Sequence, residues 1–153
     1  MFNFFKKKEE ICALTAGKLI GITEVKDQVF SQKLMGDGYA IIPENGIITA
    51  PSSGSIKFCF PTNHAVGLVD EEGREYLIHM GLDTVELKGE GFKKFIENSQ
   101  KVKQGDKLME MDLDLIKSKG YDCTVIVVYP KNSVELNEKG TVAAGQKLNI
   151  KIK

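Results

Sequence analysis

The sequence predicts an all-β fold, an antiparallel β-sandwich or barrel-sandwich with short connecting helical turns. Short apolar or alternating runs occupy most of the chain, and turn residues such as Gly36-Asp37-Gly38 separate them. Few stretches have the periodicity of a helix. With 153 residues, 42% of them hydrophobic and 27% charged, the chain has the size and composition of one globular domain.

The first expected strands are bounded by clusters of Gly, Pro, Asn, Asp and Ser, residues that favour turns. Their apolar or alternating runs fit the pleated surface of a sheet. The segment Asp70-Glu71-Glu72-Gly73, between the last two of these runs, is typical of a β-hairpin turn. The expected strands are 18–22, 39–43, 47–50, 54–60, 65–70 and 75–80.

The second half of the chain is expected to contain shorter strands and two helical turns. The segment 92–99 is short and ends in polar residues. The segment 113–119 follows a candidate N-cap at Asp112 and precedes Gly120, a residue that commonly ends helices. Further apolar runs predict strands at 85–87, 107–112, 124–128 and 148–152.

One pattern occurs twice, from Val102 to Leu108 and from Val142 to Leu148. Both segments have Val, two residues, Gly, one residue and then Lys-Leu, followed by an apolar or alternating run. The pattern predicts a tight glycine turn that leads into a strand in both places. Sandwich folds built from duplicated hairpin units contain such turns, although two copies alone do not establish a repeat.

The charge balance argues against nucleic acid as a partner. The chain has 21 Lys and Arg against 21 Asp and Glu, whereas nucleic-acid-binding domains usually carry a basic excess. No apolar run approaches the ~18 residues of a membrane-spanning helix. The start from Met1 to Lys8 is apolar and then basic, the reverse of a secretory signal. We therefore expect a cytoplasmic protein, and a monomer from its size and charge balance.

Residues 1–10 are expected to form a flexible tail, and residues 11–153 a single domain. The Phe and Lys residues of this tail could give weak contact with an anionic membrane surface. The three cysteines, Cys12, Cys59 and Cys123, are odd in number, widely spaced and without a CxxC motif. This pattern predicts reduced thiols rather than a disulfide framework or a zinc knuckle.

The only two histidines, His64 and His79, flank the expected hairpin. A two-residue loop at Glu71-Glu72 would pair His64 directly with His79, with their Cβ atoms ~5 Å apart. Two imidazolium ions that close repel each other, so at least one ring should be neutral near pH 7 and present a free nitrogen. Thr62 could orient His64, and a carbonyl in the turn at Gly81 could accept a ring proton.

Three functions suit such a histidine pair. One is phosphoryl transfer with one histidine as nucleophile, and another is a pH-sensing or partner-binding surface without chemistry of its own. A zinc hydrolase would need a further ligand, for which Asp37 and Asp83 are candidates, but HxH and HExxH motifs are absent. The sequence also lacks a Walker A loop, so a phosphoryl group would come from another protein rather than from bound ATP.

The chain from about Gly36 to its C-terminus resembles a known family. The blocks that carry the likeness are Gly36 to Ile41, Ala50 to Gly54, Thr62 to Ala65 and His79 to Phe92. They are similar to the glucose-type enzyme IIA component of the bacterial phosphoenolpyruvate-dependent sugar phosphotransferase system. The resemblance implies a β-sandwich phosphocarrier that accepts a phosphoryl group from HPr on a histidine and passes it to a cysteine of the IIB domain of a sugar transporter.

The resemblance also implies roles for individual residues. By motif position, His79 is the phosphoryl acceptor through Nε2, His64 supports the phosphoryl group, and Thr62 forms a hydrogen bond within the site. The Gly81 carbonyl receives the Nδ1 proton of His79. Residues 11–153 are then the single enzyme IIA phosphocarrier domain.

Further residues are expected to contact partners. Asp37 and Asp83 match two acidic residues beside the site and would pair with basic side chains of a partner. Phe60 and Leu77 are candidates for an apolar collar that excludes water during transfer. No cofactor is required, although His64 and His79 could share a zinc ion with a partner. The resemblance identifies neither the sugar nor any regulatory target, because sugar specificity lies in the membrane partner.

Overall fold

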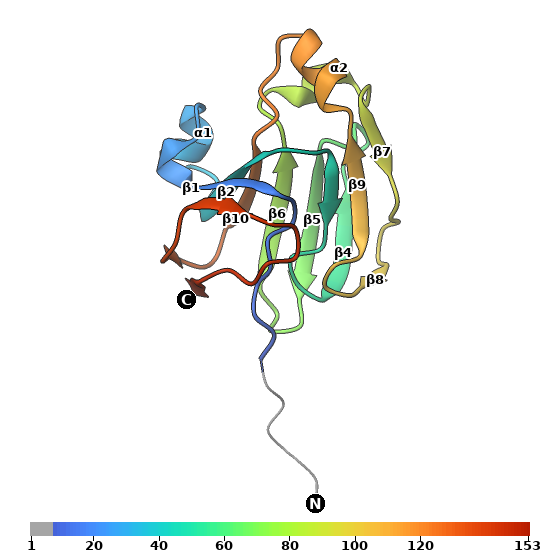
Figure 1. Cartoon of the computed structure of the whole chain (residues 1–153). Helices are drawn as coiled ribbons and strands as arrows, with labels where there is room; N and C mark the ends of the chain where they lie inside the picture. The colour runs from blue at the N-terminus through green and yellow to red at the C-terminus, as the bar shows by residue number, and fades with distance from the viewer. Residues whose placement is uncertain (1–7) are drawn as a thin grey trace, which may run out of the picture.

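Antiparallel strands dominate the computed structural model, which describes residues 8–153 (Figure 1). The main sheet has eight strands in the order β12-β1-β2-β10-β6-β5-β4-β8, so β6 and β5 lie in its interior. Its strands are β1 (Gly17–Gly21), β2 (Asp37–Pro43), β4 (Gly54–Cys59), β5 (Ala65–Asp70), β6 (Glu75–Met80), β8 (Lys101–Val102), β10 (Val125–Tyr129) and β12 (Gly140–Val142).

Smaller sheets and short helices complete the architecture. A three-stranded sheet has the order β3-β9-β7, and β11 pairs with β13. Figure 1 shows α1 at the side of the main sheet next to β1 and β2, and α2 above β9. These elements are β3 (Ile47–Thr49), β7 (Phe92–Lys94), β9 (Lys107–Met111), β11 (Val134–Leu136), β13 (Ile150–Ile152), η1 (Ile22–Glu24), α1 (Gln28–Ser31), η2 (Thr84–Leu87) and α2 (Leu113–Ser118).

The main sheet is apolar on both faces. Side chains alternate along a strand, and on β10 Val125 and Val127 belong to the large core whereas Ile126 and Val128 belong to a second cluster. The second cluster also contains residues of η1 and α1, including Phe30. α1 therefore packs on the face of the sheet opposite the large core, and this second face carries the side chain of His79.

The fold class is confirmed, as are most of the expected strands. The structure has strands at 65–70 and 75–80 with the expected bounds, and α2 begins after Asp112, whose carboxylate accepts a hydrogen bond from the Leu115 N–H. All three cysteines are free. The repeated glycine pattern forms the same turn twice: Gly105 and Gly145 both have positive φ, at 93° and 79°.

Two of the expected elements differ in type from the prediction. Residues 85–87 belong to η2 rather than a strand, and Val85 is 45% exposed instead of packed in a sheet. The segment 92–99 begins with β7 rather than a helix, because Phe92 pairs with Met111 of β9 and packs against the core. Tertiary pairing here overrides a weak local preference.

The register of the β5–β6 hairpin also differs, by one residue, from the predicted register. Ala65, not His64, lies opposite His79. The loop is longer than the expected two residues, because the Gly73 N–H donates to the Asp70 carbonyl and Gly73 adopts a φ of 80°. Such a turn with a left-handed glycine adds one residue and shifts the pairing.

Glu9 and Glu10, near the start of the described residues, contact side chains of the sandwich. The Glu9 carboxylate accepts hydrogen bonds from the Ser53 N–H at 2.6 Å and the Ser53 hydroxyl at 2.7 Å, and Glu10 lies 3.7 Å from Lys147. The expected flexible tail and its membrane contact fall, for residues 1–7, outside the described residues. Between residues 8 and 153, no helix has the length and apolar character needed to cross a membrane.

Candidate functional site at a histidine pair

The imidazole rings of His64 and His79 lie in contact on the second face of the main sheet. Their centroids are 5.0 Å apart and their planes meet at 78°. His79 comes from β6, and His64 immediately precedes β5. The sequence predicted contact between these rings from a direct pairing of His64 with His79. That register is wrong by one residue, so another feature must account for their contact.

A turn ahead of β5 places His64. Asn63 has a φ of 58°, and its N–H donates to the Phe60 carbonyl at 2.8 Å. The alternation of β5 therefore does not extend back to His64, whose carbonyl still accepts the Met80 N–H at 2.7 Å. This break in the strand allows both imidazoles to share one face although His64 and His79 are not directly opposed.

A second turn fixes the tautomer of His79. Its Nδ1 lies 2.8 Å from the Gly81 carbonyl oxygen, and because a carbonyl only accepts, Nδ1 carries the proton. Gly81 has a φ of 86°, and a Cβ there would lie 2.4 Å from Thr84 Cγ2 and 2.9 Å from the Asp122 oxygen. Only glycine fits this turn, which leaves Nε2 of His79 as the unprotonated nitrogen.

Thr84 supports this turn and was not singled out in the sequence. It is fully buried, and its hydroxyl donates to the Met80 carbonyl at 2.6 Å. The Gly81 N–H donates to the Thr124 carbonyl at 2.8 Å, which attaches the turn to the start of β10. The position of Thr84 inside the His79 to Phe92 block was the available signal.

The electrostatic surroundings keep both rings neutral. Burial, followed by the charge of His79, lowers the pKa of His64 from 6.5 to about 4. Burial also lowers the pKa of His79, while the Gly81 carbonyl and the carboxylates of Asp27 and Asp83 act in the opposite direction. Near pH 7 the Nε2 of His79 therefore has an available lone pair.

Thr62 contacts the second histidine. Its hydroxyl lies 2.5 Å from Nδ1 of His64. A hydroxyl can donate to this nitrogen or accept from it. The contact leaves Nε2 of His64 free for another partner in either case.

Aromatic rings flank the histidines on both sides. The Phe60 ring lies 5.3 Å from His64 and 5.0 Å from the Phe58 ring, while Phe30 of α1 lies 5.0 Å from His79. Phe60 is half-buried and does not belong to either core cluster. Leu77 is also half-buried and shares the face of His79, two residues away on β6.

Asp37 and Asp83, the acidic residues expected beside the site, differ in the hydrogen bonds and ion pairs that their carboxylates form. Asp37 accepts hydrogen bonds from the N–H groups of Gly38 and Val134, both at 2.9 Å, and lies 3.4 Å from Lys33. Its carboxylate therefore links β2 to β11. Asp83 is exposed at the start of η2, and within residues 8–153 its side chain forms no capping hydrogen bond there.

Phe30 contacts His79 and the charge of Asp27 acts on its ring, and both residues were missed in the sequence. Phe30 belongs to α1 and Asp27 is its N-cap, and a helix of only four residues carries little helical periodicity. Contact between α1 and β6 is a tertiary feature, so local pattern gave no signal for it.

The histidine pair offers a metal two nitrogen atoms at most, because each Nδ1 already has a partner in Thr62 or Gly81. Over residues 8–153, no group of three or more His, Cys, Asp and Glu side chains could hold a metal ion. A zinc site usually has four ligands. The described part of this chain alone does not complete one.

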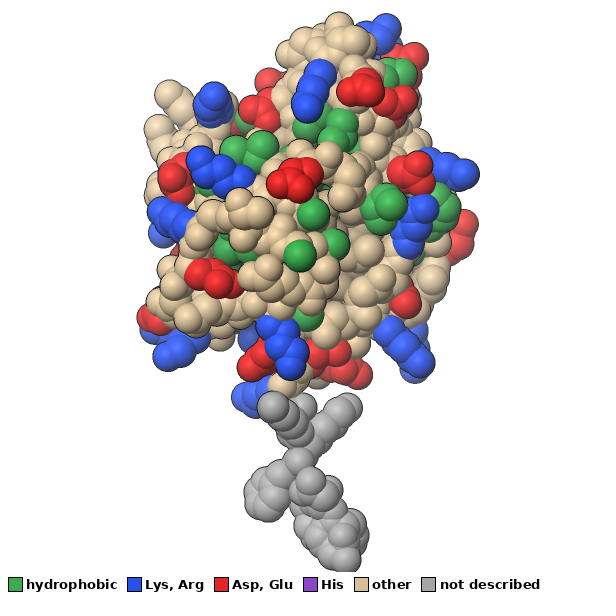
Figure 2. Space-filling model, viewed as in Figure 1, with side chains coloured by type: hydrophobic (Ala, Val, Ile, Leu, Met, Phe, Trp, Pro, Cys, Tyr) green, Lys and Arg blue, Asp and Glu red, His purple; other side chains and the backbone are tan. Residues whose placement is uncertain are grey.

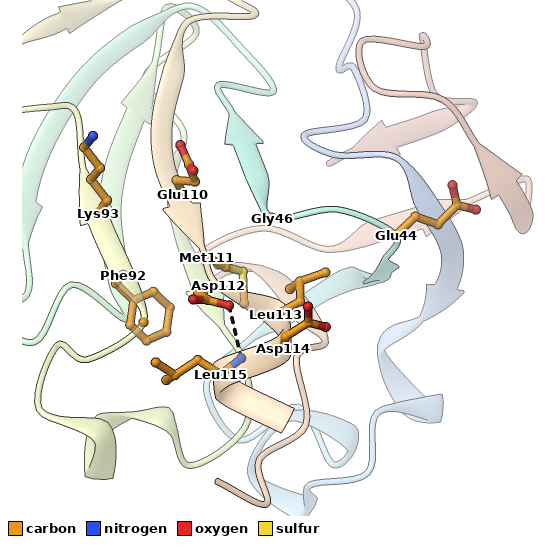
Figure 3. A pocket seen from close by; sticks show the side chains of 11 residues that line it. Glu44, Gly46, Phe92, Lys93, Glu110, Met111, Asp112, Leu113, Asp114 and Leu115 are labelled. Atoms are coloured by element: carbon orange, nitrogen blue, oxygen red, sulfur yellow. Dashed lines mark hydrogen bonds between the residues drawn. The ribbon is translucent and has the colours of Figure 1, made fainter. Parts of the chain in front are cut away.

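A separate hollow of about 590 Å³ lies between the β2–β3 turn, β7 and the junction of β9 with α2 (Figure 3). It contains neither histidine. Its charged lining is mostly acidic, from Glu44, Glu110, Asp112 and Asp114, with Lys93 as the basic residue, so it does not suit a phosphoryl group.

Figure 2 shows acidic and basic side chains interspersed over the viewed face, with no histidine visible there.

The antiparallel β-sandwich brings two neutral imidazoles into contact, which defines a protein with a candidate histidine-centred site. Residues 9–135 match the family model of the phosphoenolpyruvate-dependent sugar phosphotransferase system, EIIA 1. The chain belongs to this family and is a sugar phosphotransferase system EIIA component.

Two relatives illustrate the likeness. The chain is 44% identical over 146 residues to the PTS system glucose-specific EIICBA component of Streptococcus pneumoniae serotype 4, covering 93% of this chain and 20% of that protein. It thus spans one fifth of the length of this curated relative. Glucose permease IIA from Mycoplasma capricolum superposes with a TM-score of 0.85 at 37% identity, covering 97% of this chain and 99% of the other.

Proposed function

We propose that this chain carries a phosphoryl group on Nε2 of His79, between the phosphocarrier HPr and a cysteine of an IIB domain. The observation that supports this most strongly is the hydrogen bond of the His79 Nδ1–H to the Gly81 carbonyl at 2.8 Å. It leaves Nε2 as the nucleophile in a ring that is neutral near pH 7. The family of the chain and its relatives agree with a phosphotransferase role.

Bonds and electron pairs balance in both steps of the proposed transfer. The Nε2 lone pair of His79 forms the new bond to phosphorus as the bond between phosphorus and the HPr donor atom breaks, and that atom keeps the electron pair. Because Nδ1 keeps its proton, the ring becomes cationic, and the Gly81 carbonyl stabilises this charge. In the second step, the cysteine thiolate of IIB displaces Nε2, which regains its lone pair.

His64 has a supporting role in this proposal. With the Thr62 hydroxyl donating to Nδ1, the His64 proton resides on Nε2, from which it can donate to a phosphoryl oxygen. A neutral donor stabilises the phosphoryl group moderately, and therefore does not trap it on the carrier. The 5.0 Å separation of the ring centroids agrees with such a donor beside the acceptor.

The surroundings of the pair suit protein docking. Phe60 and Leu77 would form part of an apolar collar that excludes water, and exposed Asp83 would meet a basic side chain of HPr or IIB. Asp37 is a weaker candidate for this, because its carboxylate is engaged within the fold. Other exposed apolar side chains lie on segments next to the histidines: Val29, Leu34, Met35, Phe58 and Val85.

Two further expectations belong to the proposal. The chain would act in the cytoplasm as a monomer, where its phosphoryl donor and acceptor are found. A zinc ion would bind at His64 and His79 only where a partner supplies the missing ligands.

Intact-mass measurement tests the proposal. The chain is incubated with phosphoenolpyruvate, enzyme I and HPr, and the reaction is quenched at alkaline pH because phosphohistidine is acid-labile. We expect a gain of one phosphoryl group that acid treatment removes and that His79→Gln abolishes. No gain with partners that phosphorylate another EIIA would overturn the proposal.

His64→Gln is the matched variant. It should still accept a phosphoryl group but pass it to IIB slowly, because the donor to the phosphoryl oxygen is lost. Equal transfer by this variant and by the unmodified chain would contradict the role of His64.

A further inference from the structure

The imidazole of His79 contacts α1 as well as His64. Phe30 of α1 is 4% exposed, belongs to the second apolar cluster and has its ring centroid 5.0 Å from that of His79. The ring planes of Phe30 and His79 meet at 58°. The His79 ring is thus in contact with both His64 and Phe30.

The place of Phe30 depends on Asp27. The Asp27 carboxylate accepts the Val29 N–H at 2.9 Å, and its carbonyl accepts the N–H groups of Phe30 at 3.1 Å and Ser31 at 2.8 Å. A helix of four residues has too few internal hydrogen bonds to persist alone, so its N-cap contributes a large share of its stability.

Asp27 is also one of the charges that act on the His79 ring. The ionisable groups that act on this ring are Asp27 before α1 and Asp83 before η2, with neutral His64 in contact. Both carboxylates favour a positively charged imidazole. Asp37, which sequence resemblance placed beside the site, is instead engaged by backbone N–H groups and Lys33.

We propose that Asp27 is a positioning residue of the phosphoryl-transfer site, which caps α1, thereby seats the Phe30 ring against the imidazole of His79, and carries a negative charge that acts on that ring. The inference rests on the proposed function, because the ring becomes cationic when Nε2 gains a phosphoryl group and Nδ1 keeps its proton. Asp27 stabilises this state without contacting the phosphoryl group. It acts through the orientation and the charge of His79.

Two substitutions separate the parts of this role. Asp27→Asn keeps a side-chain oxygen for the N-cap but removes the charge, and Asp27→Ala removes both. Asp112 offers a matched control, since its carboxylate caps α2 by accepting the Leu115 N–H at 3.1 Å (Figure 3) and it is not among the charges acting on His79. Asp112→Asn and Asp112→Ala therefore report on the loss of a cap alone.

Two readouts are compared across these variants. The pKa of His79 is measured by NMR titration of the full chain, and kcat and KM are measured for phosphoryl transfer from phosphorylated HPr. For Asp27→Asn we expect a lower His79 pKa and a kcat lower by about threefold. KM should change by less than about twofold, since the residue does not dock the partner.

The outcomes decide between positioning and simpler roles. Asp27→Ala should lower kcat further than Asp27→Asn, while both Asp112 variants should leave the His79 pKa unchanged. The proposal is overturned if Asp27→Asn leaves the pKa and kcat as they were, if only KM changes, or if Asp27→Ala behaves like Asp112→Ala. The titration needs no phosphoryl donor, so it can support or refute the role of Asp27 even if the proposed function fails.

Discussion

Replacing Gly81 with alanine tests the turn that sets the tautomer of His79. Gly81 has a φ of 86°, which an alanine adopts at a cost of about 1–2 kcal/mol. The new Cβ would lie 2.4 Å from Thr84 Cγ2 and 2.9 Å from the Asp122 oxygen. Since the Asp122 oxygen is backbone, the chain must move, at a further cost of about 1–3 kcal/mol.

We therefore expect Gly81→Ala to lower the free energy of unfolding by about 2–5 kcal/mol. The movement also displaces the carbonyl that accepts the Nδ1 proton of His79, so phosphoryl acceptance should fall by at least about tenfold. Urea unfolding monitored by circular dichroism measures the first effect. Initial rates of phosphoryl transfer from phosphorylated HPr measure the second, under conditions in which the variant is folded.

Gly120 provides the matched control. It has a φ of 90°, but apart from its chain neighbours no atom of residues 8–153 lies within 4 Å of the position its Cβ would take. Gly120→Ala should therefore lower the free energy of unfolding by only the ~1–2 kcal/mol that a left-handed alanine costs, and it should leave the rate of phosphoryl transfer unchanged. If Gly81→Ala is no more destabilising than Gly120→Ala, or transfers at the unmodified rate, the reasoning about this turn is refuted.

Two other predictions concern the same site. Thr84→Val should lower the free energy of unfolding by about 1–3 kcal/mol, because the buried Met80 carbonyl loses the hydroxyl that donates to it; urea unfolding would show this, and an unchanged midpoint would contradict it. The pKa of His64 is about 4 in the folded chain against 6.5 ordinarily, so below pH 6.5 the unfolded chain binds the additional proton and stability should fall as pH decreases towards 4. Carboxylates also titrate between pH 4 and 6.5, so the unmodified chain is compared with His64→Gln, whose free energy of unfolding should fall less over this range. Parallel curves of stability against pH for the two proteins would count against a buried, neutral His64.

The strands with strong patterns were predictable, but their register was not. The alternating runs on both sides of Asp70-Glu71-Glu72-Gly73 located β5 and β6 with the observed bounds. The register depended on whether Gly73 lies within the loop in a left-handed conformation, and the composition of the segment suits either turn. A change of one residue in the loop was enough to separate His64 from the position opposite His79.

The site was predictable in its residue types and only partly in its contacts. His79, Gly81 and the Thr62-Asn63-His64 segment were located from spacing and family likeness, and the structure brings them together. The hydrogen bond from the Val134 N–H to the Asp37 carboxylate joins residues far apart in the sequence, so no local pattern predicts it. The same is true of Asp27, whose charge acts on His79 only because α1 packs on the face of the sheet that carries this ring.

Histidine-selective ¹⁵N NMR of the phosphorylated chain tests the central claim most directly, because there are only two histidines to assign. We expect the ring of His79 to change to that of an Nε2-substituted imidazole with a protonated Nδ1, while His64 stays neutral and unsubstituted. Phosphorus on Nδ1 of His79, phosphorus on His64, or two unchanged rings in a chain that has gained a phosphoryl group would contradict the account.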